Sequence, residues 1–207
     1  MNARPNRIPL FPLDVVLFPG AALPLHIFEP RYKKMIGLCL ARSLEFGVIY
    51  ATDTGISSVG CTADVLQKLK QYDDGRMDIL TQGRAIFEMN ELLDEKEYQE
   101  AVVEYLPEDA SAQNESEEKQ LMDLFQQCHS ALFGHAWIAD ASATPPLSYR
   151  MAALLPLALK EKQGLLEMRE ESRRRNFLFN RMTQLLPQIV HRQRVRKSAA
   201  GNGHGIN

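Results

Sequence analysis

The sequence has few cysteines, and none of them forms a paired motif. Cys39, Cys61 and Cys128 lie far apart, and no CxxC occurs. Zinc ribbons and thioredoxin-like sites need that spacing, so both classes are excluded. An odd number of cysteines without a disulfide framework suits a reducing compartment, and we expect three buried free thiols.

Long hydrophobic runs are also missing. No segment approaches the roughly 20 apolar residues of a membrane helix. The amino terminus resembles a secretory signal, because Arg4 and Arg7 precede an apolar run. Asp14 interrupts that run, however, and Pro9 and Pro12 oppose the helix that a signal peptide forms. We therefore expect a cytoplasmic protein that does not contact a membrane.

The common catalytic motifs are absent. There is no GxxxxGK[ST] loop for phosphates, no HExxH pair for zinc and no GxSxG nucleophile turn. His129 and His135 lie six residues apart, so they do not share a helix face as two metal ligands would. The sequence therefore predicts no catalytic residue, no metal site and no cofactor.

Charge is nearly balanced but unevenly distributed. The formal net charge is −2 and the pI is about 6.2, which makes a nucleic-acid partner unfavourable. Residues 88–118 carry twelve Asp and Glu, whereas residues 169–197 carry nine Lys and Arg. We expect both stretches to be solvated faces; the alternatives are that they face each other, or that the basic helix meets an acidic partner.

The most informative segment is Ile8–Ile36, which combines five prolines with apolar residues. A long helix could not carry them, because each proline removes an N–H and blocks the preceding turn. We expect extended chain, a turn at Pro19-Gly20, extended chain again and a helix from Pro30. Proline suits the first helical position, and an apolar stripe at helical spacing follows: Tyr32, Met35, Ile36 and Cys39.

The first half of the chain reads mostly as strands with this one helix. Turn signals separate them, including Asp73-Asp74-Gly75 and a break at Gly83-Arg84. Many short strands of this kind predict a closed or nearly closed sheet. The expected strands are Pro9–Phe18, Ala22–Phe28, Phe46–Ala51, Cys61–Tyr72, Arg76–Thr81, Ala85–Leu92 and Glu97–Leu106.

The second half reads as helices. Residues 1–107 are expected to form the strand-rich subdomain, 108–114 a polar linker, 115–197 a helical subdomain and 198–207 a flexible tail. Apolar stripes mark the two main helices, one through Leu121, Phe125 and Cys128 and a long one over Glu171–Arg194. Short helices are expected at Ser148–Leu155 and Lys160–Met168.

Several segments together resemble one known family. PLFPLDVVLFPGAALPLHIFEPRYKKMI is similar to the opening of the amino-terminal domain of Lon proteases, also found in stand-alone bacterial proteins. Gly83-Arg84, Tyr98–Glu104 and the later SYRMAALLPLALKEKQGLLE match the family too, so the resemblance covers roughly Ile8–Leu186. It implies an α+β fold: a PUA-like β pseudobarrel with one helix, followed by a carboxy-terminal α-helical bundle.

The resemblance implies a non-catalytic polypeptide-binding module, similar to the substrate-recognition domain of Lon and without its ATPase or serine–lysine protease parts. Expected partners are unfolded or extended polypeptides, and a protease or chaperone that an adaptor in protein quality control would serve. Two alternatives stay open. One is an RNA-binding PUA-like protein that uses the arginine-rich final helix, and the other is a small hydrolase.

The polar residues of Phe28–Tyr32, FEPRY, are the candidate polypeptide-binding site. The predicted site residues are Glu29, Arg31, Tyr32 and Arg84. A structural role is the alternative. Glu29 precedes a helix whose first N–H groups favour a carboxylate, and an arginine could hold it by a bidentate contact.

Overall fold

The computed structural model describes residues 4–107, 115–138 and 145–201. The chain divides into two compact units. We call residues 1–108 with 144–169 the strand unit, and residues 109–143 with 170–207 the helical unit. The predicted linker, 108–114, lies outside the described residues.

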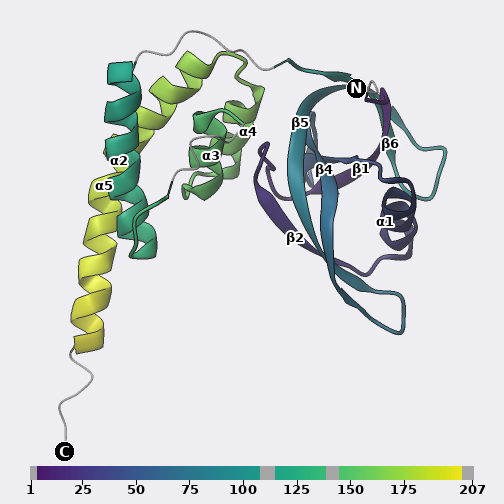
Figure 1. The fold of residues 1–207 in the computed structure, drawn as a ribbon, viewed down its shortest axis with the longest axis horizontal. Coiled ribbons are helices and arrows are strands. Elements are labelled where there is room, and N and C mark those ends of the chain that lie inside the picture. Colours follow the sequence, from purple (N-terminus) through teal and green to yellow (C-terminus); the bar gives the residue numbers. More distant parts are fainter. Residues whose placement is uncertain (1–3, 108–114, 139–144, 202–207) are drawn as a thin grey trace, which may run out of the picture. The chain divides into compact units, whose positions relative to one another are not determined.

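Six strands in the strand unit form one sheet that closes on itself (Figure 1). β5 pairs with β4 from Met77 to Glu88 and with β6 from Phe87 to Leu93. β6 pairs with β1, β1 with β3 and β3 with β4, which completes the ring. β2 is added outside the ring on the first half of β5. The closed sheet predicted from the turn spacing is therefore confirmed. The strands are β1 Arg7–Leu13, β2 Ala22–Ile27, β3 Phe46–Thr52, β4 Gly55–Gln71, β5 Met77–Leu93 and β6 Glu100–Tyr105.

β5 runs unbroken through the position where the sequence predicted a break. Gly83 lies inside it and touches the turn that joins β1 to β2. Its carbonyl accepts a hydrogen bond from the Gly20 N–H at 2.8 Å, and its own N–H donates to the Ala21 carbonyl at 2.9 Å. A glycine is needed here so that two backbones can approach, and it does not end the strand.

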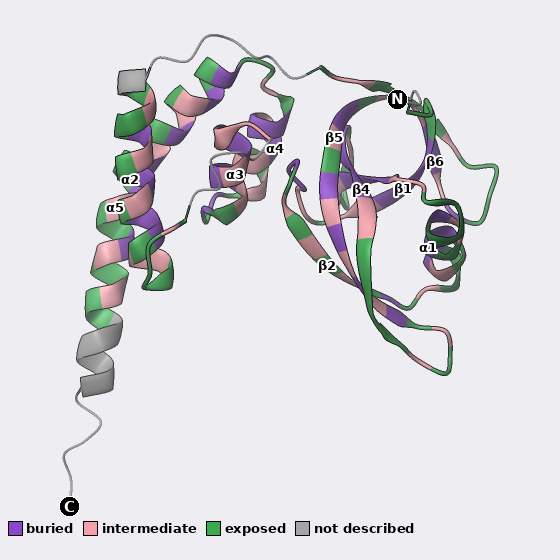
Figure 2. Ribbon diagram, viewed as in Figure 1, coloured by how far each residue is buried: buried purple, intermediate pink, exposed green. Residues whose placement is uncertain are grey.

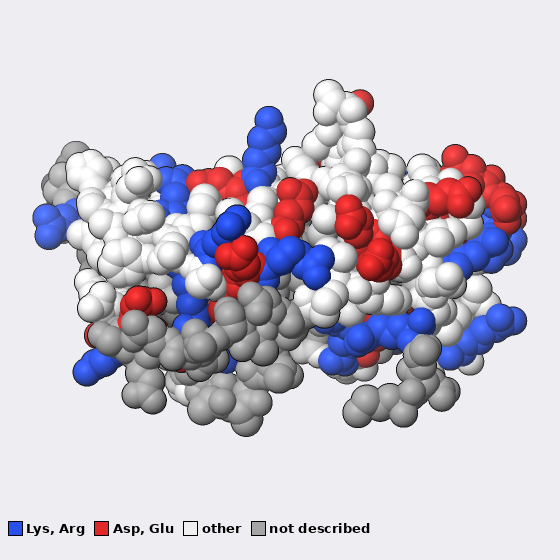
Figure 3. Space-filling view, turned by 90° about the horizontal axis from the view of Figure 1, so that it is seen from above, with Lys and Arg blue, Asp and Glu red and all other residues white. Residues whose placement is uncertain are grey.

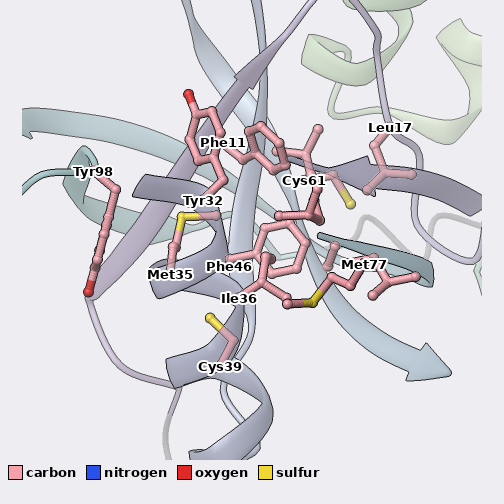
Figure 4. Close-up of a cluster of buried hydrophobic side chains, with 14 residues drawn as sticks. Phe11, Leu17, Tyr32, Met35, Ile36, Cys39, Phe46, Cys61, Met77 and Tyr98 are labelled. Atoms are coloured by element: carbon pink, nitrogen blue, oxygen red, sulfur yellow. The ribbon is translucent and has the colours of Figure 1, made fainter. Parts of the chain in front are cut away.

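Helix α1, Pro30–Arg42, begins at the expected proline and supplies one side of the main core. Ser43 ends the helix in the left-handed conformation, at φ 52°. The buried positions of α1 are the four predicted from its stripe: Tyr32, Met35, Ile36 and Cys39. They pack against Phe11, Phe46 and Cys61 from the strands, as Figure 4 shows. Full burial of each large apolar side chain contributes about 1.5–3 kcal/mol.

Two short helices, α3 (Leu147–Leu154) and α4 (Leu159–Glu167), belong to the strand unit. The Tyr149 ring of α3 stacks on Phe18 at a centroid distance of 5.8 Å. The Gln163 amide of α4 donates to the Val59 carbonyl of β4 at 3.0 Å. Both helices therefore belong with the strands, whereas the expected boundaries assigned them to a helical subdomain at 115–197.

The helical unit contains α2, Glu115–Phe133, and α5, Glu171–Gly201. The helices run parallel, because Glu118 contacts Arg175 near their starts and Ala131 contacts Gln193 farther along. Both predicted apolar stripes are buried at Leu121, Phe125 and Cys128 of α2 and at Leu178, Met182, Leu185 and Ile189 of α5.

α5 also continues past its expected end at Arg194, so residues 198–201 of the predicted tail are helical. The rest of that tail, 202–207, lies outside the described residues. Among the helices of the described residues, none is both long and apolar enough to cross a membrane.

Candidate functional site

Glu29 and Arg31 of the FEPRY element contact each other at the start of α1. The Glu29 carbonyl accepts the N–H groups of Tyr32 and Lys33 at 3.1 and 2.9 Å, so the backbone of Glu29 caps the helix. Its side chain makes no cap hydrogen bond. One carboxylate oxygen of Glu29 instead accepts a hydrogen bond from Arg31 Nε at 2.8 Å and lies 2.8 Å from Arg31 Nη2. This ion pair is half exposed, with 37% of the Glu29 side chain and 48% of the Arg31 side chain accessible.

Tyr32 is a core residue. The centre of its ring lies 4.1 Å from that of Phe11, and the Arg31 guanidinium lies over the Tyr32 ring at 4.5 Å. Burial raises the pKa of the Tyr32 hydroxyl. The element therefore presents Arg31 and Glu29 to solvent and places Tyr32 beneath them.

Arg84 lies away from the other three predicted site residues. Its Nε and Nη2 bind the two carboxylate oxygens of Asp64 at 2.9 and 2.8 Å. Arg84 lies two residues after Gln82, which pairs with Ala22, the first residue of β2. The FEPRY element instead follows Ile27, the last residue of β2. The length of β2, about 20 Å at the usual rise per residue, separates the two places.

Apolar side chains that the sequence analysis did not single out gather on the solvent side of β2, β5 and β4. Leu66 and Leu69 occupy two β-bulges in β4, where the pairing with β5 shifts by one residue. Val65 packs against the core and Lys68 lies opposite the core residue Ile79, so the alternation of side chains places the residues that follow them, Leu66 and Leu69, on the other side of the sheet. Both leucines are about half exposed, at 49% and 52%, and Phe28 beyond the end of β2 is 58% exposed. No local sequence signal marks these bulges.

We call this surface the outer face. Register and the alternation of strand side chains place its members together: Pro24, His26, Phe28, Leu66, Leu69 and Leu80. The opposite side of the same strands faces the core through Ile27, Met77 and Ile79. In Figure 2 the far part of the β4–β5 hairpin is largely exposed, and Leu66–Gln71 are exposed throughout.

Charged groups on the outer face are engaged with their neighbours. One Asp78 oxygen accepts His26 Nδ1 at 2.5 Å, and the other accepts the Tyr72 hydroxyl at 2.9 Å. The hydrogen bond from His26, followed by that from Tyr72, lowers the pKa of Asp78, which is therefore ionised at neutral pH. The Lys70 ammonium lies 4.3 Å from the centre of the Tyr72 ring.

Among the described residues, the cysteine thiols and the His129 imidazole have structural surroundings. Burial raises the pKa of Cys39 and of Cys128 to about 11, so neither thiol ionises readily at neutral pH. His129 Nδ1 donates to the carbonyl of His135 at 3.1 Å and thereby closes the turn after α2. Within the described ranges, no cluster of three or more His, Cys, Asp or Glu could hold a metal ion.

Comparison with known proteins identifies the family. The model of the ATP-dependent protease La (LON) substrate-binding domain matches residues 7–184. The chain belongs to this family. This result confirms the resemblance seen in the sequence, and the matched range includes both FEPRY and the outer face.

Individual relatives are Lon proteases. The chain is 25% identical to Lon protease of Flavobacterium johnsoniae over 79% of its own length and 22% of that protein. It is 27% identical to Lon protease 2 of Syntrophobacter fumaroxidans over 92% of its own length and 26% of that protein. The chain thus spans about a quarter of the length of these curated relatives.

Solved structures show the same fold. A Lon N-terminal domain protein from Xanthomonas campestris has a TM-score of 0.67 and 22% identity, covering 84% of this chain and 97% of that one. The N-terminal domain of the Mycobacterium avium complex Lon protease has a TM-score of 0.64 and 17% identity, covering 86% and 98%. The expected fold, a β pseudobarrel followed by helices, is confirmed.

Proposed function

We propose that this protein is a non-catalytic polypeptide-binding module that recognises unfolded or extended chains through its outer face. The supporting observation is the set of half-exposed apolar side chains on one sheet surface in a member of a substrate-binding family. Scattered exposed apolar residues are ordinary, but a contiguous group commonly marks a binding surface.

An adaptor role in protein quality control follows from this proposal. The module would hold a client polypeptide in the cytoplasm and present it to a protease or a chaperone. Apolar recognition suits that role, because unfolded chains expose the side chains that folded proteins bury.

RNA binding, the first alternative, would use a basic surface. On the face seen in Figure 3, blue and red side chains are interspersed, with no extended area of one sign. Binding to RNA through phosphates would weaken steeply with added salt, whereas apolar recognition of polypeptide would not.

The test is binding of the full chain to fluorescently labelled, reduced and carboxymethylated α-lactalbumin, followed by anisotropy at low and high salt. The double variant Leu66→Ser/Leu69→Ser should lose at least tenfold in affinity. Leu92→Ser is the matched control, because Leu92 is also exposed, at 38%, but lies on the half of β5 that pairs with β6. Equal losses in both variants, or tighter binding to single-stranded RNA than to the unfolded protein, would refute the proposal.

A further inference from the structure

We propose that the outer face binds a short amphipathic segment of its polypeptide ligand in helical form, and not as an added β-strand. The inference rests on the proposed function, since it concerns the same face. It names the conformation and side-chain pattern that this surface selects from an unfolded chain.

Addition of a strand is disfavoured by the topology. An added strand needs a row of free backbone N–H and C=O groups at a sheet edge. The ring of β5, β4, β3, β1 and β6 is closed, and two open edges lie near the outer face: β2, and the part of β4 from Asp64 to Gln71, which among the described strands pairs with β5 alone because β3 pairs only with Gly55–Ala63. The β4 edge carries the two bulges together with exposed Lys68 and Lys70, and bulges and lysines are features that blunt an edge against an added strand. Pro24 in the middle of β2 has no N–H to offer, and proline in a strand typically protects an edge.

The size of the apolar surface fits a short segment better than a folded partner. Phe28, Leu66 and Leu69 together expose on the order of 300 Å², at the lower end of the range typical of functional patches. A stable interface between folded proteins buries about 800 Å² on each side, so a second copy of this chain does not match.

The dimensions fit a helix. Three neighbouring strands span about 10 Å at the usual spacing, which matches the 10–12 Å width of a helix with its side chains. A helix also satisfies its own backbone hydrogen bonds, so it needs no edge.

The charge pattern selects the apolar side of such a helix. Both oxygens of Asp78 are already bonded, and Arg84 and Asp64 neutralise each other beside the face. An apolar stripe can therefore cover the leucines and Phe28 without leaving a new charge buried and unpaired. A disordered client segment with residues at i, i+3, i+4 and i+7 can fold into that helix on binding.

Two labelled peptides of identical composition test the proposal, one with leucines at i, i+3, i+4 and i+7 and one with the same leucines at alternate positions. Their affinities for the full chain are measured by anisotropy. We expect the helix-patterned peptide to bind at least tenfold tighter and to gain helical circular dichroism when bound. A proline at its centre should weaken binding roughly 100-fold, because proline opposes the helix interior. Leu66→Ser/Leu69→Ser should lose the preference, whereas Leu92→Ser should retain it.

The two levels of the proposal fail differently. If unfolded α-lactalbumin binds through Leu66 and Leu69 but the peptides bind equally, or the alternating peptide binds tighter, the helical inference is wrong and the binding function stands. If neither peptide binds while the unfolded protein does, the inference is also overturned. If the unfolded protein itself does not bind, the proposed function fails.

Discussion

A Cβ atom added at Gly83 would lie 2.2 Å from the carbonyl oxygen of Phe18 and 2.9 Å from its carbonyl carbon. Real Cβ contacts are never this short, and both obstructing atoms belong to the backbone. The β1–β2 turn can therefore rest on β5 only because residue 83 has no side chain.

Gly83→Ala should destabilise the strand unit. Either the turn or β5 must move, and overpacking of this kind costs about 1–3 kcal/mol. For a protein of this size, 1 kcal/mol shifts the melting temperature by roughly 2–4 °C, so calorimetry should detect the change. Gly37→Ala is the control: Gly37 is an exposed residue of α1 with no atom near the added Cβ, and the substitution should raise stability slightly. Equal melting of Gly83→Ala and wild type would contradict the packing described here.

Arg174→Met should strongly destabilise the helical unit. The Arg174 side chain is 1% exposed, and its Nε and Nη2 bind the buried Glu171 carboxylate at 3.1 and 2.7 Å. Removing one partner of a buried pair costs about 3 kcal/mol, because the buried Glu171 carboxylate then loses one of its ion pairs and keeps the one that its other oxygen makes with Arg175 at 2.9 Å. Urea unfolding measures the loss. Arg173→Met is the matched control, since the neighbouring Arg173 pairs with Glu170 at 72% exposure and should change stability by less than about 1 kcal/mol. Similar losses in both variants would show that burial of the pair is unimportant.

Glu100→Gln should flatten the acid dependence of stability. Burial alone would raise the pKa of Glu100, but hydrogen bonds from Lys96 and Arg7 outweigh it and lower the pKa. A folded-state pKa below the unfolded one means that Glu100 stabilises the fold above about pH 4.5. This contribution declines below that value and is lost as pH falls through the lower folded-state pKa. Denaturant midpoints between about pH 7 and pH 3 should fall more steeply for wild type than for the variant. Parallel curves would rule out a role for this carboxylate.

Glu29→Ala tests whether FEPRY is a recognition element. The carboxylate caps no N–H and makes a half-exposed ion pair with Arg31, so its loss should cost less than about 1 kcal/mol. The binding role predicted for Glu29, Arg31, Tyr32 and Arg84 is then tested by measuring how tightly the variants bind unfolded α-lactalbumin. A large loss of affinity in Glu29→Ala and Arg31→Ala with unchanged melting would assign recognition to this element. Unchanged affinity would assign Glu29 and Arg31 to the surface of α1.

Local patterns were enough to predict much of the fold. Pro30 and the stripe that follows it specified α1, because both signals act within one helix. No local sequence signal indicates which unit α3 and α4 pack against. Their attachment depends on contacts between residues distant in sequence, such as Gln163 with Val59 and Tyr149 with Phe18. Periodicity reports which residues are buried and not what buries them.

The candidate site was harder to predict for a related reason. Leu66 and Leu69 stand in LQKLKQ, whose spacing looks like an ordinary strand or a helix turn. Only the bulges, fixed by pairing with β5, turn both leucines to one side. Charged residues such as Glu29 and Arg84 are natural candidates for a binding site in a sequence. In the structure, however, Glu29 is paired with Arg31 and Arg84 with Asp64.

The strand unit is built from two separate stretches of chain, with α2 inserted between them. During synthesis on a ribosome, the barrel strands emerge first, but Phe18 and Val59 lack their covering helices until residue 169 has left the exit tunnel. α2 must likewise wait for α5, which follows it in the chain. Completion of both units therefore depends on the segment from α3 to α5, and a nascent chain stalled before that segment is made would expose the apolar side chains that these helices cover.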